Sequence, residues 1–209
     1  MGTPQRKARR ARSHANVHGV FILEGDWWNI PSRPVLVKPL FDLIGTMHPT
    51  MPVIQRMVAT RAEFEHYLQL WRQRRHRKYQ VLYLGFHGTR KGIYVGDQRK
   101  RPISLDDMAT ILGPHCEGRL IHFGTCDIAG TDRRNLSRFM RRTGALAVSG
   151  FRSEVTWFDS VALELYYFTL IHENPLTRKG LRAVETDLKY EFGPLTTHLR
   201  FRLEVSDGD

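Results

Sequence analysis

Cysteine residues and long apolar segments are both scarce in this sequence of 209 residues. The two cysteines, Cys116 and Cys126, are too few for the disulfide framework of a small secreted module. No N-terminal segment has the layout of a secretory signal, and no run approaches the roughly 18 apolar residues that suggest a membrane span. We therefore expect a cytoplasmic protein without a membrane span, in which both thiols are reduced and free for chemistry.

Histidines and cysteines at metal-ligand spacing are also missing. His115, Cys116 and His122 come shortly before Cys126, but they do not form the paired Cys-x-x-Cys or His-x-x-x-His pattern of a zinc site. We therefore expect neither a metal nor another cofactor. His122 belongs to a predicted strand and is expected in the core or behind the reactive centre.

Basic residues outnumber acidic ones by 32 to 21, and the formal net charge of +11 favours acidic partners. Residues 1–16 concentrate this charge and contain almost nothing apolar, so we expect a disordered arm followed by a single domain over residues 17–209. Nucleic acid is one partner for this arm, but a solvated tail is the favoured interpretation. The basic residues of the arm are Arg6, Lys7, Arg9, Arg10 and Arg12.

Two further groups of basic residues have structural explanations. The cations within residues 72–78 follow a predicted helix, and positive charge suits a helix C-terminus. The predicted helix after Cys126 carries a basic stripe, for which a solvated face is the default and docking of an acidic partner or nucleic acid is the alternative. The stripe consists of Arg133, Arg134, Arg138, Arg141 and Arg142.

Strand-like and helix-like patterns alternate along the chain. Residues 81–86 form a continuous apolar run, which indicates a strand buried on both faces of a parallel sheet. Thr60 and Glu63 form a capping-box pattern that opens a helix. The alternation predicts an α/β fold, a three-layer α/β/α sandwich around a mostly parallel central sheet. Other strands are predicted over residues 17–25, 120–124, 145–150 and 199–205, with a hairpin or edge strand over 91–97. A further segment begins at residue 35, and its length is limited by Pro34 and Pro39. Further helices are predicted over residues 104–113, 136–140, 160–172 and 177–191.

Two of the predicted central strands end in reactive side chains. One runs into His87 and Gly88, and the other runs into Cys126. Residues just past the C-terminal ends of parallel strands line the ligand crevice, so neighbouring strands would bring both side chains to one rim. An imidazole within hydrogen-bond reach takes the proton of a thiol during nucleophilic attack. The sequence therefore predicts His87 as a catalytic base and Cys126 as a nucleophile, with the amides of Gly88 and Cys126 as an oxyanion hole.

These residues carry a resemblance to a known family. Residues 83–88 (Tyr-Leu-Gly-Phe-His-Gly) and 121–126 (Ile-His-Phe-Gly-Thr-Cys) resemble the two catalytic blocks of caspase-like cysteine peptidases of clan CD, a group that includes caspases, metacaspases, gingipains, separase and CHAT domains. A third block, residues 144–150 followed by 162–170, is similar to the CHAT pattern of a strand and an aromatic-rich helix. The resemblance covers roughly residues 78–190 and implies a caspase-like fold and a thiol protease activity.

The sequence also departs from that family. The Gln-Ala-Cys-x-Gly signature of caspases is absent, and Asp127 follows the cysteine, whereas metacaspase-like members carry an acidic residue shortly before theirs. The resemblance puts the first substrate pocket beside the nucleophile and at the end of the third strand. Candidate substrate-binding residues there are Asp127, Arg152, Ser153, Glu154 and Asp159. Glu154 or Asp159 would favour a basic substrate residue and Arg152 an acidic one; the carboxylates are slightly favoured, because negative charge is also stabilised near a helix start.

Two hypotheses of function follow. The leading one is a cysteine endopeptidase that cleaves a protein or peptide substrate through a thioester acyl-enzyme, with a regulatory protein partner; analogy with the family suggests a regulated cell-death or defence system. The alternative is a catalytically inactive caspase-like or nucleic-acid-associated binding module that uses the basic surface, against which the lack of a nucleic-acid motif counts. Cys116 has no histidine partner of this kind and is expected to be structural.

Overall fold

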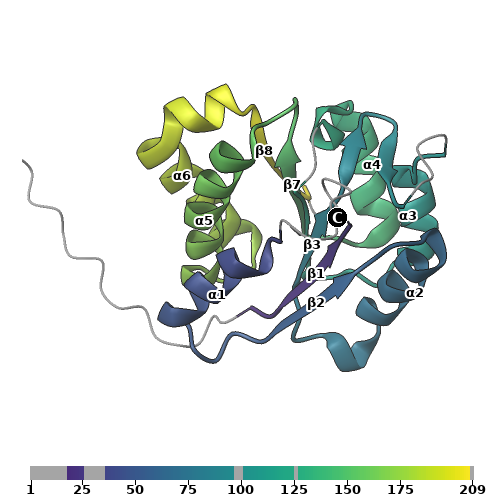
Figure 1. Ribbon diagram of the computed structural model, residues 1–209. Coiled ribbons are helices and arrows are strands. Elements are labelled where there is room, and N and C mark those ends of the chain that lie inside the picture. Colours follow the sequence, from purple (N-terminus) through teal and green to yellow (C-terminus); the bar gives the residue numbers. More distant parts are fainter. Residues whose placement is uncertain (1–17, 26–35, 97–100, 125–126, 208–209) are drawn as a thin grey trace, which may run out of the picture.

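The computed structural model describes residues 18–25, 36–96, 101–124 and 127–207. Its centre is one twisted sheet with helices on both faces (Figure 1). Within the described part of this central sheet, neighbouring strands pair in parallel except the last strand, which is antiparallel to its neighbour. The predicted α/β class with a mostly parallel sheet is confirmed, and the arrangement is compatible with a three-layer sandwich. The strand order is β2 (Val53–Met57), β1 (Val20–Glu24), β3 (Val81–Gly85), β6 (Leu120–Phe123), β7 (Ala147–Phe151) and β8 (Phe201–Val205).

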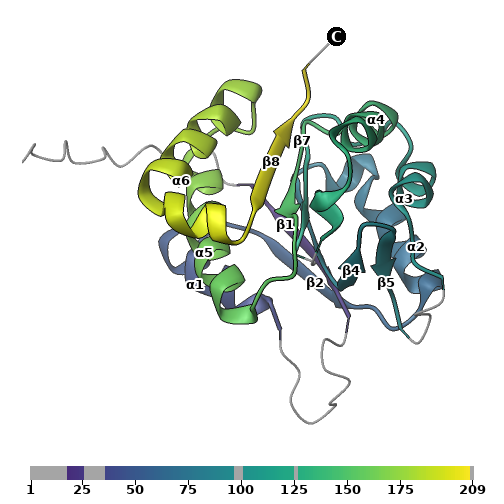
Figure 2. The same ribbon diagram turned by 90° about the horizontal axis from the view of Figure 1, so that it is seen from above.

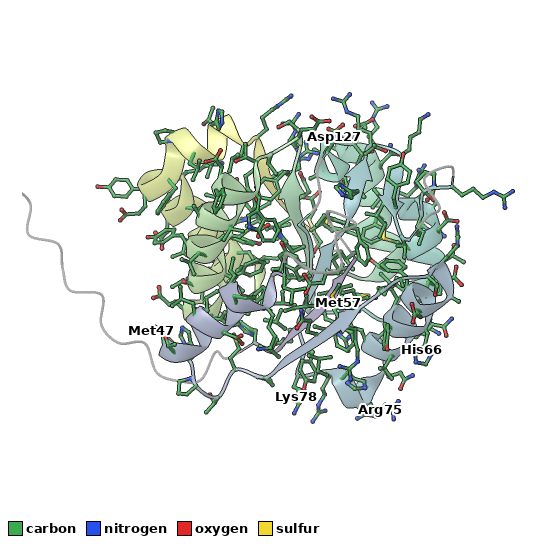
Figure 3. The ribbon with its side chains drawn as sticks, in the orientation of Figure 1. Met47, Met57, His66, Arg75, Lys78 and Asp127 are labelled. Carbon is green, nitrogen blue, oxygen red and sulfur yellow. The ribbon has the colours of Figure 1, made fainter. Side chains whose placement is uncertain are left out.

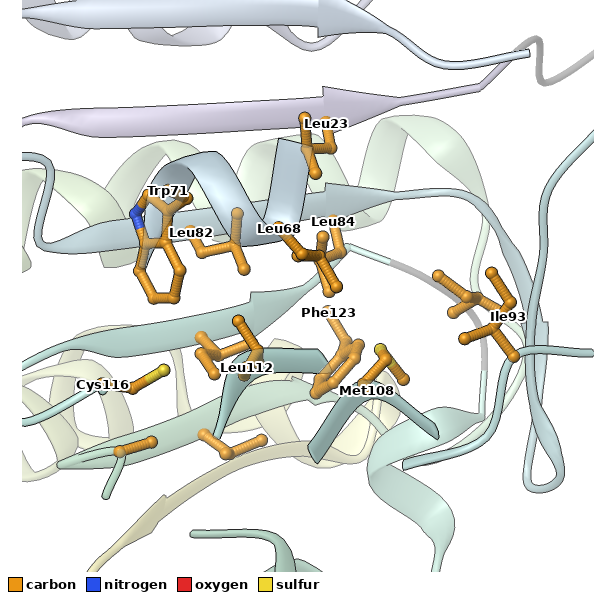
Figure 4. Packing of buried hydrophobic residues seen from close by; sticks show 14 of the residues in the cluster. Leu23, Leu68, Trp71, Leu82, Leu84, Ile93, Met108, Leu112, Cys116 and Phe123 are labelled. Carbon is orange, nitrogen blue, oxygen red and sulfur yellow. The ribbon is translucent and has the colours of Figure 1, made fainter. Parts of the chain in front are cut away.

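The helices divide evenly between the two faces of the sheet (Figure 2). Alternate residues of each strand point to opposite faces, so Leu82 and Leu84 join one core layer while Val81 and Tyr83 join the other. Figure 4 shows part of the first layer, where Leu68 and Trp71 of one helix and Met108 and Leu112 of another pack near strand residues such as Leu82 and Phe123. One face is covered by α2 (Arg61–Trp71), α3 (Leu105–Leu112) and α4 (Arg133–Thr143), and the other by α1 (Lys38–Met47), α5 (Trp157–Glu173) and α6 (Arg178–His198).

Burial on both faces explains the continuous apolar runs of the sequence. Every residue of β1, β3, β6 and β7 is buried, so these strands have no solvent-facing positions to alternate with. Slipping such a strand by one residue would exchange its two core layers. The register of the central sheet is therefore strongly specified.

Several local predictions are confirmed. Thr60 and Glu63 form a reciprocal capping box at the start of α2, and Ser104 and Asp107 form another at the start of α3. Gly113 ends α3 with a positive φ, a conformation that favours glycine. The hairpin or edge strand predicted over residues 91–97 is a hairpin that begins earlier, with β4 (His87–Thr89) paired with β5 (Gly92–Tyr94).

Two elements near the N-terminus differ from the sequence prediction. Val37 does not continue an extended segment; it is the N-cap of α1, and Pro39 occupies the first turn of that helix, where a missing N–H breaks no helical bond. Strand β2 has no counterpart in the prediction, because it is an edge strand whose Gln55 and Arg56 interrupt any apolar run. Pro34, Val35 and the predicted arm over residues 1–16 lie outside the described residues.

Among the described helices, none combines the length and the apolar character that crossing a membrane requires.

Three histidines lie close together: the buried His18 and His172, and the half-buried His48. Neither ring nitrogen of His172 has a hydrogen-bond partner within the described part of the chain. The rings of His18 and His48 lie 6.0 and 5.7 Å from it. Burial, followed by the positive charges that His18 and His48 can carry, lowers the pKa of His172 to about 3.

This cluster predicts that the fold loses stability in mild acid. The folded pKa of His172 is depressed below the unfolded value of about 6.5, so below that pH the unfolded chain takes up a proton that the folded chain refuses. The contribution is about 2 kcal/mol between about pH 7 and about pH 5. Urea unfolding at both pH values should show a smaller decline for His172→Leu than for the parent protein. An equal decline in both proteins would contradict the assignment.

Candidate active site

The candidate catalytic residues follow two strands that pair directly. Strands β3 and β6 are parallel neighbours, with Leu84 in register with Phe123. Just past this pair, one chain segment reaches His87 and the other reaches Gly124, at the same edge of the sheet. The adjacency that the sequence prediction requires is confirmed. Cys126 lies outside the described residues.

The hairpin at this edge presents both His87 and Gly88. His87 is exposed and pairs in register with Tyr94 in β5. The hairpin has a two-residue loop, so the residues that flank it, Thr89 and Gly92, form a hydrogen-bonded pair. Along an antiparallel ladder, hydrogen-bonded pairs alternate with pairs that exchange no hydrogen bonds. Gly88 is therefore in a non-bonded pair, and its N–H points away from β5. The partner of Gly88, Ile93, agrees with this reading, because both its N–H and its carbonyl bond to Ile103 on the far side.

An ion pair joins this hairpin to the segment after Cys126. Arg90 in the hairpin loop donates from Nε to Asp127 Oδ1 at 3.4 Å, and the same nitrogen lies 3.3 Å from Oδ2. Asp127 adopts a left-handed conformation with φ of 62°, which is uncommon for a residue other than glycine. Strained turns of this kind concentrate at functional sites. Asp127, predicted as a substrate-binding residue, therefore contacts the hairpin on the other side of the rim, and sequence reasoning gave no sign of its partner Arg90.

A buried polar network lies under the rim, and sequence reasoning found only its histidine. His122 is fully buried, as expected, with one ring nitrogen 2.8 Å from Ser149 Oγ and the other 3.0 Å from Glu164 Oε1. Tyr83 donates to the second carboxylate oxygen at 3.0 Å, and Tyr167 donates to Ser149 at 3.0 Å. Burial is the main cause that raises the pKa of both tyrosines, so they remain donors at neutral pH. One signal in the sequence was available: Glu164 is a lone carboxylate in an otherwise apolar stretch of α5.

Gly124 connects this network to the strand end that leads to Cys126. A Cβ at Gly124 would overlap the phenol group of Tyr83. The hydroxyl of Tyr83 is in turn held by Glu164. The backbone two residues before Cys126 therefore packs against a side chain that the buried carboxylate fixes.

The predicted substrate-binding residues after β7 differ in their exposure and in their hydrogen-bond partners. Thr156 is the N-cap of α5, and Asp159 is its partner: the Thr156 hydroxyl donates to the Asp159 carboxylate at 2.6 Å and accepts from the Asp159 N–H at 3.3 Å. Glu154 is exposed, and Ser153 is half-buried. The N–H of Arg152 bonds to the carbonyl of Arg200 at 3.2 Å.

A cavity of about 450 Å³ opens beside Arg152, between α6 and β8. The buried Nε of Arg152 has no hydrogen-bond partner in the described structure. Arg200 also lines the cavity and has a φ of 49°, again in the left-handed region. Lys189 lies there too, but Glu185 neutralises it at 2.6 Å. Glu154 and Asp159 are not among the residues that line this cavity.

Glu24 is a second buried carboxylate that sequence reasoning did not select. It ends β1 in register with Gly85, so it lies near the same edge as His87. It accepts a hydrogen bond from Val37 N–H at 2.9 Å and another from the Gln55 side chain. Burial raises its pKa, against the opposing effect of these two bonds. Glu24 thereby fixes the start of α1 beside the rim.

No group of three histidine, cysteine, aspartate or glutamate side chains gathers in a way that could hold a metal ion, as far as the chain is described.

Taken together, the described residues define a mixed α/β protein with its candidate site at the carboxyl edge of a mostly parallel sheet. Comparison with protein families identifies a match over residues 18–204 to the "Family of unknown function (DUF6642)", and the chain belongs to that family. A search of the curated proteins finds no match.

The packing at Gly124 predicts that the stability of the fold is sensitive to a side chain at this position. Gly124→Ala should lower the free energy of unfolding by about 1–3 kcal/mol, because the new methyl group must displace Tyr83 or the strand end. Gly45→Ala in α1 is a matched control, because its Cβ would make only an ordinary contact with Met51 at 3.9 Å, and alanine is the better helix former. Urea unfolding measures both variants. Equal stability of the two variants would show that Gly124 does not pack as described.

Proposed function

We propose that this chain is a cysteine endopeptidase with a caspase-like fold, in which His87 is the base and Cys126 the nucleophile. The observation that supports this most is the Arg90–Asp127 ion pair, because Asp127 directly follows Cys126 and Arg90 belongs to the hairpin of His87. Parallel pairing of β3 with β6 supports the proposal independently. Both relations are what a His/Cys pair at one rim requires.

The proposed reaction uses the hairpin in two ways. His87 takes the thiol proton of Cys126 as the sulfur bonds to the substrate carbonyl carbon, and the Gly88 N–H, which the β5 ladder leaves unused, donates to the resulting oxyanion. His87 then gives the proton to the leaving amine, which departs as the C–N bond breaks and leaves a thioester. Water hydrolyses the thioester to a carboxylic acid and restores the thiol. Peptide hydrolysis by this route needs no cofactor.

The cavity beside Arg152 supports a proposal about substrate. Arg152 and Arg200 line it without a carboxylate partner among the described residues, whereas Asp159 is engaged in a helix cap. A buried guanidinium nitrogen without an acceptor favours an anionic ligand group. We therefore propose that the cavity accepts an acidic side chain of the substrate, rather than the basic one that Glu154 and Asp159 suggested in the sequence.

Thiol labelling tests the nucleophile. Cys126→Ala should abolish labelling by a peptide electrophile, whereas Cys116→Ser should retain it. Cys116 is a suitable control because it is fully buried and burial raises the pKa of its thiol to about 12. His87→Ala should slow labelling by about 10²-fold or more, the usual contribution of a general base. Undiminished labelling of the Cys126→Ala protein would overturn the proposal.

Charge reversal tests the substrate preference. Arg152→Glu should lower kcat/KM for peptides with an acidic residue before the cut by about tenfold or more, since one lost ion pair at a partly desolvated site corresponds to over 1 kcal/mol. Arg134→Glu on the exposed surface of α4 is the matched control and should leave kcat/KM unchanged. A preference for basic residues in the parent protein would contradict the proposal.

A further inference from the structure

Four exposed cations lie at the edge of the sheet opposite the candidate active site. They occupy the turn between α2 and β3, which contains a short 3₁₀ helix, Arg74–His76. Figure 3 labels Arg75 and Lys78 at one end of the molecule and Asp127 at the other. The intervening strand β3 has five residues, which corresponds to about 16 Å. The four cations are Arg74, Arg75, Arg77 and Lys78.

The end of helix α2 does not account for these cations. Helix α2 ends at Trp71, and its last turn contains no basic residue. The macrodipole explanation offered by the sequence therefore does not hold for them, because its effect falls off within the last turn.

These cations also lack acidic partners. Some exposed arginines elsewhere do pair with carboxylates: Arg142 lies 2.7 Å from Asp106, and Arg133 lies 2.8 Å from Glu204. None of the four takes part in an ion pair within the described structure. Burial and then the charges of Arg75, Arg119 and Lys78 lower the pKa of neighbouring His76, which indicates an uncompensated positive potential.

The basic N-terminal sequence joins the domain beside this turn. Gly19 N–H bonds to the carbonyl of Lys78 at 2.9 Å. His18 is held by Gln80 at 2.8 Å and by the carbonyl of Asn174 at 3.0 Å. The described part of the chain therefore begins beside the four cations of the turn.

We propose that this turn, residues 74–78, is a docking surface for the phosphate backbone of a nucleic-acid duplex. A duplex offers closely spaced negative charges that cations bind without any apolar contact. The aromatic residues flanking the turn, Trp71 and Tyr79, are buried, so the surface offers no platform for stacking single-stranded bases. Nor does the turn expose a large apolar side chain for insertion into a membrane. The surface faces away from the candidate active site, so a bound duplex leaves that site open.

Fluorescence anisotropy with short DNA and RNA duplexes tests the proposal on the full chain. Arg75→Ala/Lys78→Ala should weaken duplex binding about tenfold and reduce the slope of log K against log salt by about 1.8, the release expected for two phosphate contacts. The control Arg134→Ala/Arg141→Ala on α4 removes the same charge from exposed positions that are unpaired within the described chain. It should reduce the duplex affinity and the salt slope less than Arg75→Ala/Lys78→Ala does. Since all four side chains are exposed, urea unfolding should confirm unchanged stability.

Binding of either duplex with this pattern supports the proposal. Equal weakening by the control variant would overturn it, because binding would then depend on net charge alone. Tighter binding of single strands, or of vesicles of anionic lipid, at the same salt concentration would also overturn it. Cys126→Ala should bind the duplex like the parent protein, so the outcome does not depend on the proposed peptidase activity.

Discussion

The parallel pairing of β3 with β6 is the constraint on which the candidate site depends. Both strands are buried on both faces, so neither can shift along the other without exchanging core layers. This fixed register decides where the chain leaves the sheet toward His87 and toward Gly124. The hairpin, the Arg90–Asp127 ion pair and the left-handed turn at Asp127 then arrange a rim that the core has already positioned.

Hydrophobic and capping patterns within single segments predicted those strands and helices whose positions depend on the segment itself. Strand-like patterns identified β3, β6 and β7, the Thr60–Glu63 motif identified the start of α2, and the start of α3 was predicted at residue 104. Strand β2 escaped prediction because an edge strand carries polar residues on its exposed positions, and α1 escaped because Pro39 suits the first turn of a helix as well as the end of a strand. Such ambiguities are resolved by tertiary packing, which no single segment contains.

The candidate site also contains residues that the sequence could predict and residues that it could not. His87 and Gly88 could be selected because their position after an apolar run is a sequence property. The partners of His122 could not, since Glu164 is distant in sequence and reaches it only because α5 packs across the sheet. The same holds for Arg90 and Asp127. Long-range polar contacts depend on the assembled fold, so a sequence pattern indicates a candidate site residue but not the groups that hold it.

The network under the rim explains why polar groups remain in this core. Burying Glu164 beside His122 has a desolvation cost that a pair of apolar side chains would avoid. Buried polar pairs of this kind often add no net stability. What the network does provide is directionality: each hydrogen bond fixes an angle as well as a distance, whereas apolar packing fixes volume alone. Tyr83 is held in one orientation by Glu164, and the methylene of Gly124 packs against it. The network therefore contributes an angular restraint on the strand end at Gly124 more than it contributes stability.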